Sequence, residues 1–256
     1  MGVVFRREFA PEHLVWFARR AEALGFDELW VVEDLGYHGG FTQATAALAA
    51  TERLGVGLGI APAVARNAAY AAMEIATLSR LFPGRFHMGF GHGMEEWIAQ
   101  VGATPISWLA ALGEVSAAAK ALVAGQRVTV SGRHVQLDDV ALAHPATALP
   151  PVSLGVRGPK SIELAAQVAD GVILAEGSGP GKVSEVRDQL GPRARITVLV
   201  WASADTSAAT PEPAITGPSN TWVGQASAWF ASGADSVVFT PLAGEPHTVI
   251  DNWSIT

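Results

Sequence analysis

The sequence predicts an α/β fold, a closed (β/α)8 TIM barrel. Two observations support this prediction: short apolar runs recur eight times along the 256 residues, and amphipathic segments separate most of them. Strands that alternate with helices form a mainly parallel sheet, and eight such units fit a barrel of about 250 residues. An open doubly wound sheet is the alternative. Because 49% of the residues are hydrophobic, the chain can bury a large core.

The predicted strands are β-branched or aliphatic runs, at residues 2–5, 28–33, 54–60, 85–91, 151–156, 171–176, 195–202 and 235–241. The predicted helices cover residues 11–24, 41–52, 67–82, 106–124, 159–169, 182–190 and 219–232. In the first helix the apolar positions repeat at helical spacing and form one stripe, made of Leu14, Phe17, Ala18, Ala21 and Leu24.

Three segments depart from the repeat. Residues 125–150 alternate like a β-hairpin with Ser-Gly at the turn, which predicts an insertion between units four and five. Residues 203–218 are rich in Ser, Ala, Thr and Pro, which predicts a loop. The residues after the last strand are too few for a full eighth helix, so the C-terminal end is shortened. We expect residues 1–256 to form a single domain.

Composition narrows the function classes. The net charge of −7 argues against a nucleic-acid or membrane-surface partner and leaves a small-molecule substrate as the expected partner. The chain has no cysteine, which excludes disulfides and thiol ligands and fits a cytoplasmic protein. We see no signal peptide and no membrane-spanning run. The seven histidines are scattered and no standard metal or nucleotide motif is present, so we expect no metal site.

Functional residues of a (β/α)8 barrel gather where the strands end. The second strand ends at Glu33, which with Asp34 forms either an acid–base pair or a helix cap. The fourth ends in GFGHG, where Gly91 permits close approach and His92 is either a proton donor or a loop residue. Glu95, three residues after His92, fits the first turn of a helix, where an acidic side chain complements the helix dipole.

The fifth strand ends in RGPKS, which predicts an anion site. Gly158 permits close backbone approach, Pro159 suits a first helical turn, and Ser161 offers a hydroxyl. Free amides at the start of a helix favour an anion, although a plain strand–helix turn would look the same. A second glycine-rich loop follows the sixth strand and consists of Glu176, Gly177, Ser178 and Gly179.

Three stretches carry a family resemblance: AEALGFDELWVVED, ATERLGVGLGIAPAVARNAAYAAMEIATLSRLFPGRFHMGFGHG and PVSLGVRGPKSIELAAQVADGVILAE. Together they resemble the bacterial luciferase-like flavin and deazaflavin oxidoreductases, and most closely the branch that depends on coenzyme F420. The resemblance covers most of residues 1–175, and GADSVVFTP fits the last strand. It implies F420 at the carboxyl end of the barrel and hydride transfer between deazaflavin C5 and a small organic substrate.

The resemblance also implies roles for individual residues. A bulge in the third strand would carry a non-prolyl cis peptide at Gly59–Ile60 behind the ring. The implied proton-transfer candidates are His92, Glu33 and Glu95. The implied cofactor-binding residues are Glu33, Gly59, Ile60, Ala61, Gly91, Arg157, Gly158, Pro159, Lys160, Ser161, Glu176, Gly177, Ser178 and Gly179.

The sequence also departs from the family pattern. Asp34 stands where some F420 enzymes have His, and Met94 stands where some have Glu. Two alternatives therefore stay open: an FMN-dependent monooxygenase of the same fold, and a barrel that binds a flavin-like ligand without turnover. The alanine-rich second and third helices favour a homodimer, although they could equally pack internally.

Overall fold

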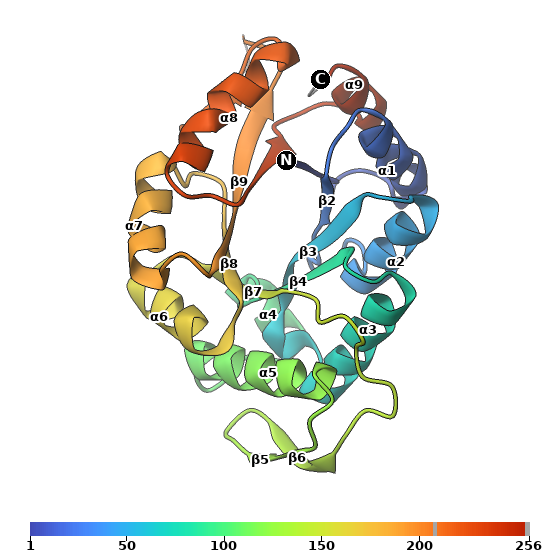
Figure 1. The fold of residues 1–256 in the computed structure, drawn as a ribbon, viewed down its shortest axis with the longest axis vertical. Coiled ribbons are helices and arrows are strands. Elements are labelled where there is room, and N and C mark those ends of the chain that lie inside the picture. The colour runs from blue at the N-terminus through green and yellow to red at the C-terminus, as the bar shows by residue number, and fades with distance from the viewer. Residues whose placement is uncertain (207–208, 254–256) are drawn as a thin grey trace.

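Eight parallel strands close into a barrel in the computed structural model, which describes residues 1–206 and 209–253 (Figure 1). The strand order around the barrel is β1-β2-β3-β4-β7-β8-β9-β11, and β11 pairs back to β1. The barrel strands are β1 Gly2–Val4, β2 Glu28–Val31, β3 Gly55–Pro62, β4 Phe86–Gly91, β7 Val152–Val156, β8 Gly171–Leu174, β9 Arg195–Ser203 and β11 Ser236–Pro241. The predicted (β/α)8 barrel is confirmed, and each barrel strand overlaps a predicted run.

Helices surround the barrel as an outer ring (Figure 1). They are α1 Leu14–Ala23, α2 Gly40–Ala50, α3 Ala68–Leu81, α4 Glu95–Gln100, α5 Trp108–Val123, α6 Pro159–Val168, α7 Pro180–Leu190, α8 Trp222–Ala231 and α9 Pro246–Asp251, with single 3-10 turns at Pro11–His13, Ala63–Ala65 and Ser219–Thr221. Asn67 caps α3, because its side chain accepts the Ala69 N–H at 2.8 Å. Within the described residues, no helix is both long and apolar enough to span a membrane.

The predicted insertion is an antiparallel hairpin of β5 Val128–Ser131 and β6 Gln136–Val140. It lies outside the ring, beyond α5 (Figure 1). Glu114 of α5 anchors its turn, because the carboxylate accepts the N–H groups of Arg133, His134 and Val135 at 3.2, 2.7 and 3.0 Å. The hairpin is therefore fixed to the helix that precedes it.

The prediction of a loop over residues 203–218 is wrong in part. Ala214–Thr216 form an extra strand, β10, which pairs in parallel with β9. The strand is stable because Ile215 is fully buried and Gln225 of α8 bonds to both backbone groups of Thr216, at 3.3 and 2.8 Å. Residues 207–208 of this segment lie outside the described residues. The expected short eighth helix is α9, which lies beside α1 (Figure 1).

Trp30 of β2 fills the centre of the barrel. It is 1% exposed and belongs to an inner apolar cluster with Val4, Ile173, Leu199 and Val238. Two glycines of β3 make room for it: a Cβ on Gly57 would lie 2.4 Å from the indole ring, and one on Gly59 would lie 2.7 Å from it. The Trp30 indole can therefore pack here only because positions 57 and 59 of β3 are glycines.

A polar network continues from Trp30 through the barrel interior. The indole N–H donates to Glu28 at 2.8 Å, and Glu28 also accepts the Ser236 hydroxyl at 2.8 Å and pairs with Arg195. The His87 ring packs edge-on against Trp30, with centroids 4.9 Å apart. Burial, together with the nearby positive charge of Arg195, lowers the pKa of His87 to about 3.

Gly57→Ala should destabilise the fold, because the new methyl group collides with Trp30. Overpacking of a core costs about 1–3 kcal/mol, so we expect a loss of that size in the free energy of unfolding measured with urea. The matched control is Gly224→Ala in α8, where no atom lies within 4 Å of the added Cβ. This control should be neutral or slightly stabilising. Equal stability of the two variants would contradict this account of Trp30.

His87 should make stability depend on pH. Its folded pKa of about 3 lies below the ordinary 6.5, so between these values the unfolded chain binds a proton that the native chain does not. Stability therefore falls as the pH drops below 6.5, by at most about 1.4 kcal/mol per unit. Between pH 7 and pH 5, the wild type should lose about 2 kcal/mol more unfolding free energy than His87→Gln. Equal losses would show that His87 is not held neutral.

Candidate active site

A cavity of about 1040 Å³ opens at the carboxyl ends of the barrel strands. Its lining includes Ile60 from β3, His92 after β4, Arg157 after β7 and Glu176 after β8. Active sites of (β/α)8 enzymes lie at this end of the barrel, because the loops there vary without disturbing the strands. This cavity is therefore the candidate active site.

The floor of the cavity is formed where β3 bulges. The peptide bond between Gly59 and Ile60 is cis, as predicted, and the register of β3 against β4 shifts at this point. The Ile60 side chain lies against two glycines: a Cβ on Gly91 would approach it to 2.8 Å and one on Gly155 to 3.0 Å. Ile60 also packs on the Trp30 cluster. The floor is therefore an apolar surface supported from below.

The RGPKS segment lies at one side of the cavity. Arg157, Gly158, Pro159, Lys160 and Ser161 all line it, and Gly158 precedes the first turn of α6. The Ser161 hydroxyl is not free: it accepts the N–H groups of Arg157 and Gly158, at 3.2 and 3.3 Å, and donates to the Gly158 carbonyl at 2.8 Å. Arg157 and Lys160 are exposed and form no ion pair within the described residues. These two cations can therefore donate hydrogen bonds to a bound anion.

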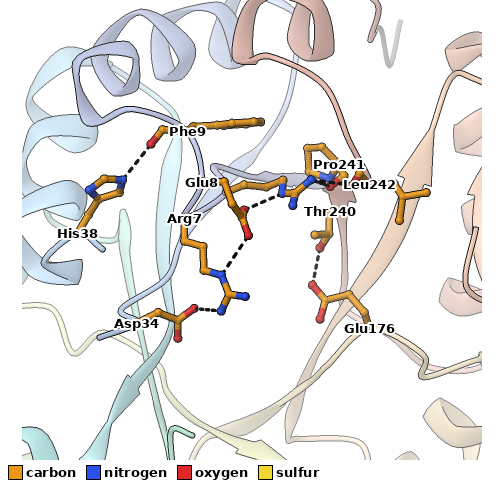
Figure 2. Close-up of polar contacts among 10 residues, drawn as sticks. Arg7, Glu8, Phe9, Asp34, His38, Glu176, Thr240, Pro241 and Leu242 are labelled. Carbon is orange, nitrogen blue, oxygen red and sulfur yellow. Dashed lines mark hydrogen bonds and ion pairs between the residues drawn. The ribbon is translucent and has the colours of Figure 1, made fainter. Parts of the chain in front are cut away.

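The second glycine-rich loop reaches the cavity only through Glu176. This carboxylate accepts the Thr240 hydroxyl at 2.8 Å, and both residues line the cavity (Figure 2). Gly177, Ser178 and Gly179 are not part of the lining, and the Ser178 carbonyl accepts the Trp229 indole N–H at 2.9 Å instead.

Glu33 lies outside the cavity wall. Its carboxylate forms a two-point ion pair with Arg66, with both N–O distances at 2.7 Å, and accepts the Gly40 N–H at 3.1 Å. Ala61 is fully buried and is also absent from the lining. Asp34, the next residue after Glu33, does line the cavity. The structure therefore brings Asp34, rather than Glu33, to the candidate site.

His92 lines the cavity and makes no hydrogen bond within the described residues; its Nε2 is enclosed by the protein. Its ring lies 6.0 Å from that of Trp108. Burial lowers the pKa of His92, and the charge of Glu95 opposes this effect. Glu95 and Glu96 are exposed in the first turn of α4 and line the mouth.

The sequence analysis missed the residues that follow β1. Arg6, Arg7 and Glu8 line the cavity, as do Trp201 and Thr240 from the last two barrel strands. The signal was present, because a charged RRE triplet directly after an apolar strand marks a functional position in a barrel.

The titration of His92 tests this geometry. We expect an NMR pH titration to give His92 a pKa below the ordinary 6.5, because burial disfavours the charged ring. Glu95→Gln should lower that pKa further, since the variant removes the charge that opposes burial. Asp188→Asn, an exposed substitution on α7, is the control and should leave it unchanged. A rise in the pKa of His92 in Glu95→Gln would contradict the arrangement.

Comparison with known proteins places this geometry in a family. The model of the luciferase-like monooxygenase family matches residues 4–215. A 5,10-methylenetetrahydromethanopterin reductase of Methanolobus tindarius is 31% identical over 179 residues, which cover 67% of this chain and 54% of the reductase. An F420-dependent glucose-6-phosphate dehydrogenase of Beutenbergia cavernae is 32% identical over 187 residues, which cover 67% of this chain and 55% of the dehydrogenase. The chain spans about half the length of these curated relatives.

Two solved structures share the fold. An F420-dependent secondary alcohol dehydrogenase in complex with an F420–acetone adduct superposes with a TM-score of 0.83 at 17% identity, over 98% of this chain and 96% of that one. A coenzyme F420-dependent tetrahydromethanopterin reductase from Methanopyrus kandleri gives a TM-score of 0.82 at 16% identity, with the same coverage of 98% and 96%. Since the family model matches most of its length, the chain belongs to the luciferase-like monooxygenase family.

Proposed function

We propose that the chain is an F420-dependent oxidoreductase that moves a hydride between the cofactor and a small organic substrate. The observation that carries the proposal is the cavity itself, which combines an apolar floor at Ile60 with two cations at its edge, Arg157 and Lys160, that form no ion pair within the described residues. A planar ring with an anionic tail fits such a site. The relatives named as F420-dependent enzymes support the same assignment.

The chain's own residues would hold the cofactor at two places. Ile60, seated between Gly91 and Gly155, gives the ring an apolar surface. Arg157 and Lys160 attract the phosphate, and the first turn of α6 adds its dipole. When bound, F420 supplies a carrier that gives or accepts a hydride.

We assign the accompanying proton to His92. Its lowered pKa keeps the imidazole neutral near pH 7, so that a ring nitrogen can accept a proton from the substrate. Glu95 lies close enough to stabilise the protonated ring, because its charge raises the pKa of His92. Glu33 is left out of this assignment, since its carboxylate is engaged by Arg66 away from the cavity.

The homodimer remains a prediction, and the surface of α3 supports it. Tyr70, Met73 and Leu81 are 67%, 51% and 61% exposed on this helix. Exposed apolar side chains gathered on one helix favour association of protein surfaces. Sedimentation of the purified chain would measure its oligomeric state.

Binding of F420 tests the proposed function. We expect the protein to bind F420 more tightly than FMN in fluorescence titrations. Arg157→Gln combined with Lys160→Gln should weaken F420 binding by about tenfold to a hundredfold, because two charge-assisted contacts are lost. Arg193→Gln, an exposed arginine outside the cavity, is the control and should bind as the wild type does.

Two outcomes would contradict the proposal. Preference for FMN would favour the monooxygenase alternative and an assay of oxygen consumption. F420 binding that is unchanged in the double variant would mean that the anion site is not at α6.

A further inference from the structure

Two further cations line the cavity on the side away from RGPKS. Arg6 and Arg7 follow β1, whereas Arg157 follows β7, and these two strands lie four places apart in the ring of eight. Arginines in a binding cavity commonly receive carboxylate or phosphate groups, because the guanidinium offers several N–H donors in one plane. The contacts of Arg6 and Arg7 argue against that role here.

Arg7 contacts two carboxylates and two aromatic rings. Its Nη1 donates to Asp34 at 2.8 Å and its Nε to Glu8 at 3.1 Å (Figure 2). Its guanidinium carbon also lies 5.2 Å from the ring centre of Tyr37 and 5.3 Å from that of Trp97, which is within the range of a cation–π contact. One side chain thus ties together the segments that follow β1, β2 and β4 at the cavity mouth.

Arg6 is occupied in the same way. Its Nη1 donates to the carbonyls of Pro241 and Leu242, at 3.1 and 2.7 Å, and its Nε donates to Glu8 at 3.0 Å. Glu8 therefore bridges both arginines, and Figure 2 shows its contact with Arg7. These bonds fix the segment after β1 to the end of β11.

Carboxylates are the most numerous charged groups in the cavity lining. There are five, those of Glu8, Asp34, Glu95, Glu96 and Glu176, and within the described residues Glu8 and Asp34 are the two that pair with Arg6 and Arg7. Glu95 and Glu96 form no ion pair within the described part of the chain. Burial keeps His92 from adding a positive charge, since it lowers the pKa of that ring.

We propose that Arg6 and Arg7 are positioning residues that brace the cavity mouth, and that the substrate is an uncharged or cationic organic molecule, not an anion. The apolar residues Val4, Leu199 and Trp201 line the same cavity and suit a hydrocarbon body. This inference rests on the proposed function, because it takes the cavity as the substrate site. The two pairs of cations therefore differ in role: Arg157 and Lys160 receive an anion, whereas Arg6 and Arg7 do not.

The first test compares three probes of equal shape and different charge: benzyl alcohol, benzylammonium and benzoate. Their affinities for the F420-loaded protein are measured by ligand-observed NMR at low ionic strength. We expect benzylammonium and benzyl alcohol to bind at least about threefold tighter than benzoate, and salt to narrow the gap between benzylammonium and benzoate. Tightest binding by benzoate would overturn the proposal, and so would no measurable binding of any probe.

The second test frees Arg7. Asp34→Asn keeps the shape of the side chain but removes the closer of the two carboxylates that hold the guanidinium, so benzoate should gain about fivefold to tenfold in affinity. The double variant Arg7→Gln/Asp34→Asn should lose that gain, because the released guanidinium that binds benzoate is then absent. Asp188→Asn on α7 removes the same charge outside the cavity and should leave benzoate binding unchanged. An unchanged benzoate affinity in Asp34→Asn would overturn the bracing role.

Failure of the proposed function would be distinguishable from failure of this inference. If F420 does not bind, the oxidoreductase assignment fails, and the same three probes are then titrated into the cofactor-free protein. The order of their affinities still reports the charge preference of the mouth. A preference for benzoate in that experiment would overturn the inference independently.

Discussion

The packing of Trp30 against glycine backbone is the constraint on which the rest of the structure depends. A tryptophan fits inside an eight-stranded barrel only if the neighbouring strand has no side chain there, and Gly57 and Gly59 meet that requirement. The indole then supports Ile60, which packs on its cluster from above. Because Ile60 also rests against Gly91 and Gly155, the position of the cavity floor follows from the packing of the core.

The order of the strands in the closed barrel then sets where the charged side chains lie around that floor. Residues that follow β7 lie across the cavity from residues that follow β1. Arg157 and Lys160, which pair with no carboxylate in the described part of the chain, are therefore separated from the paired Arg6 and Arg7. Electrostatic attraction for an anion is thereby confined to one side. A cofactor with an anionic tail and a substrate without one would occupy the same cavity without competing for the same groups.

Periodicity and turn residues predicted all eight barrel strands and the hairpin insertion, because these are local patterns. The missed features depend on contacts between distant residues. Glu33 and Asp34 are adjacent carboxylates, yet alternate side chains point to opposite sides of an extended chain, and of the two Asp34 alone lines the cavity. The role of Arg7 depends on a partner 27 positions away. β10 forms because Gln225 of α8 holds its backbone, which its own Ser- and Pro-rich segment does not reveal.

A crystal structure of the protein with F420 bound would test the central claim most directly. The account predicts that the deazaflavin ring lies on Ile60 beside Gly91 and that the phosphate contacts Arg157 or Lys160. The side chains of Arg6 and Arg7 should keep their contacts to Glu8 and Asp34. A ring placed away from the β3 bulge, or a phosphate bound by Arg7, would contradict it.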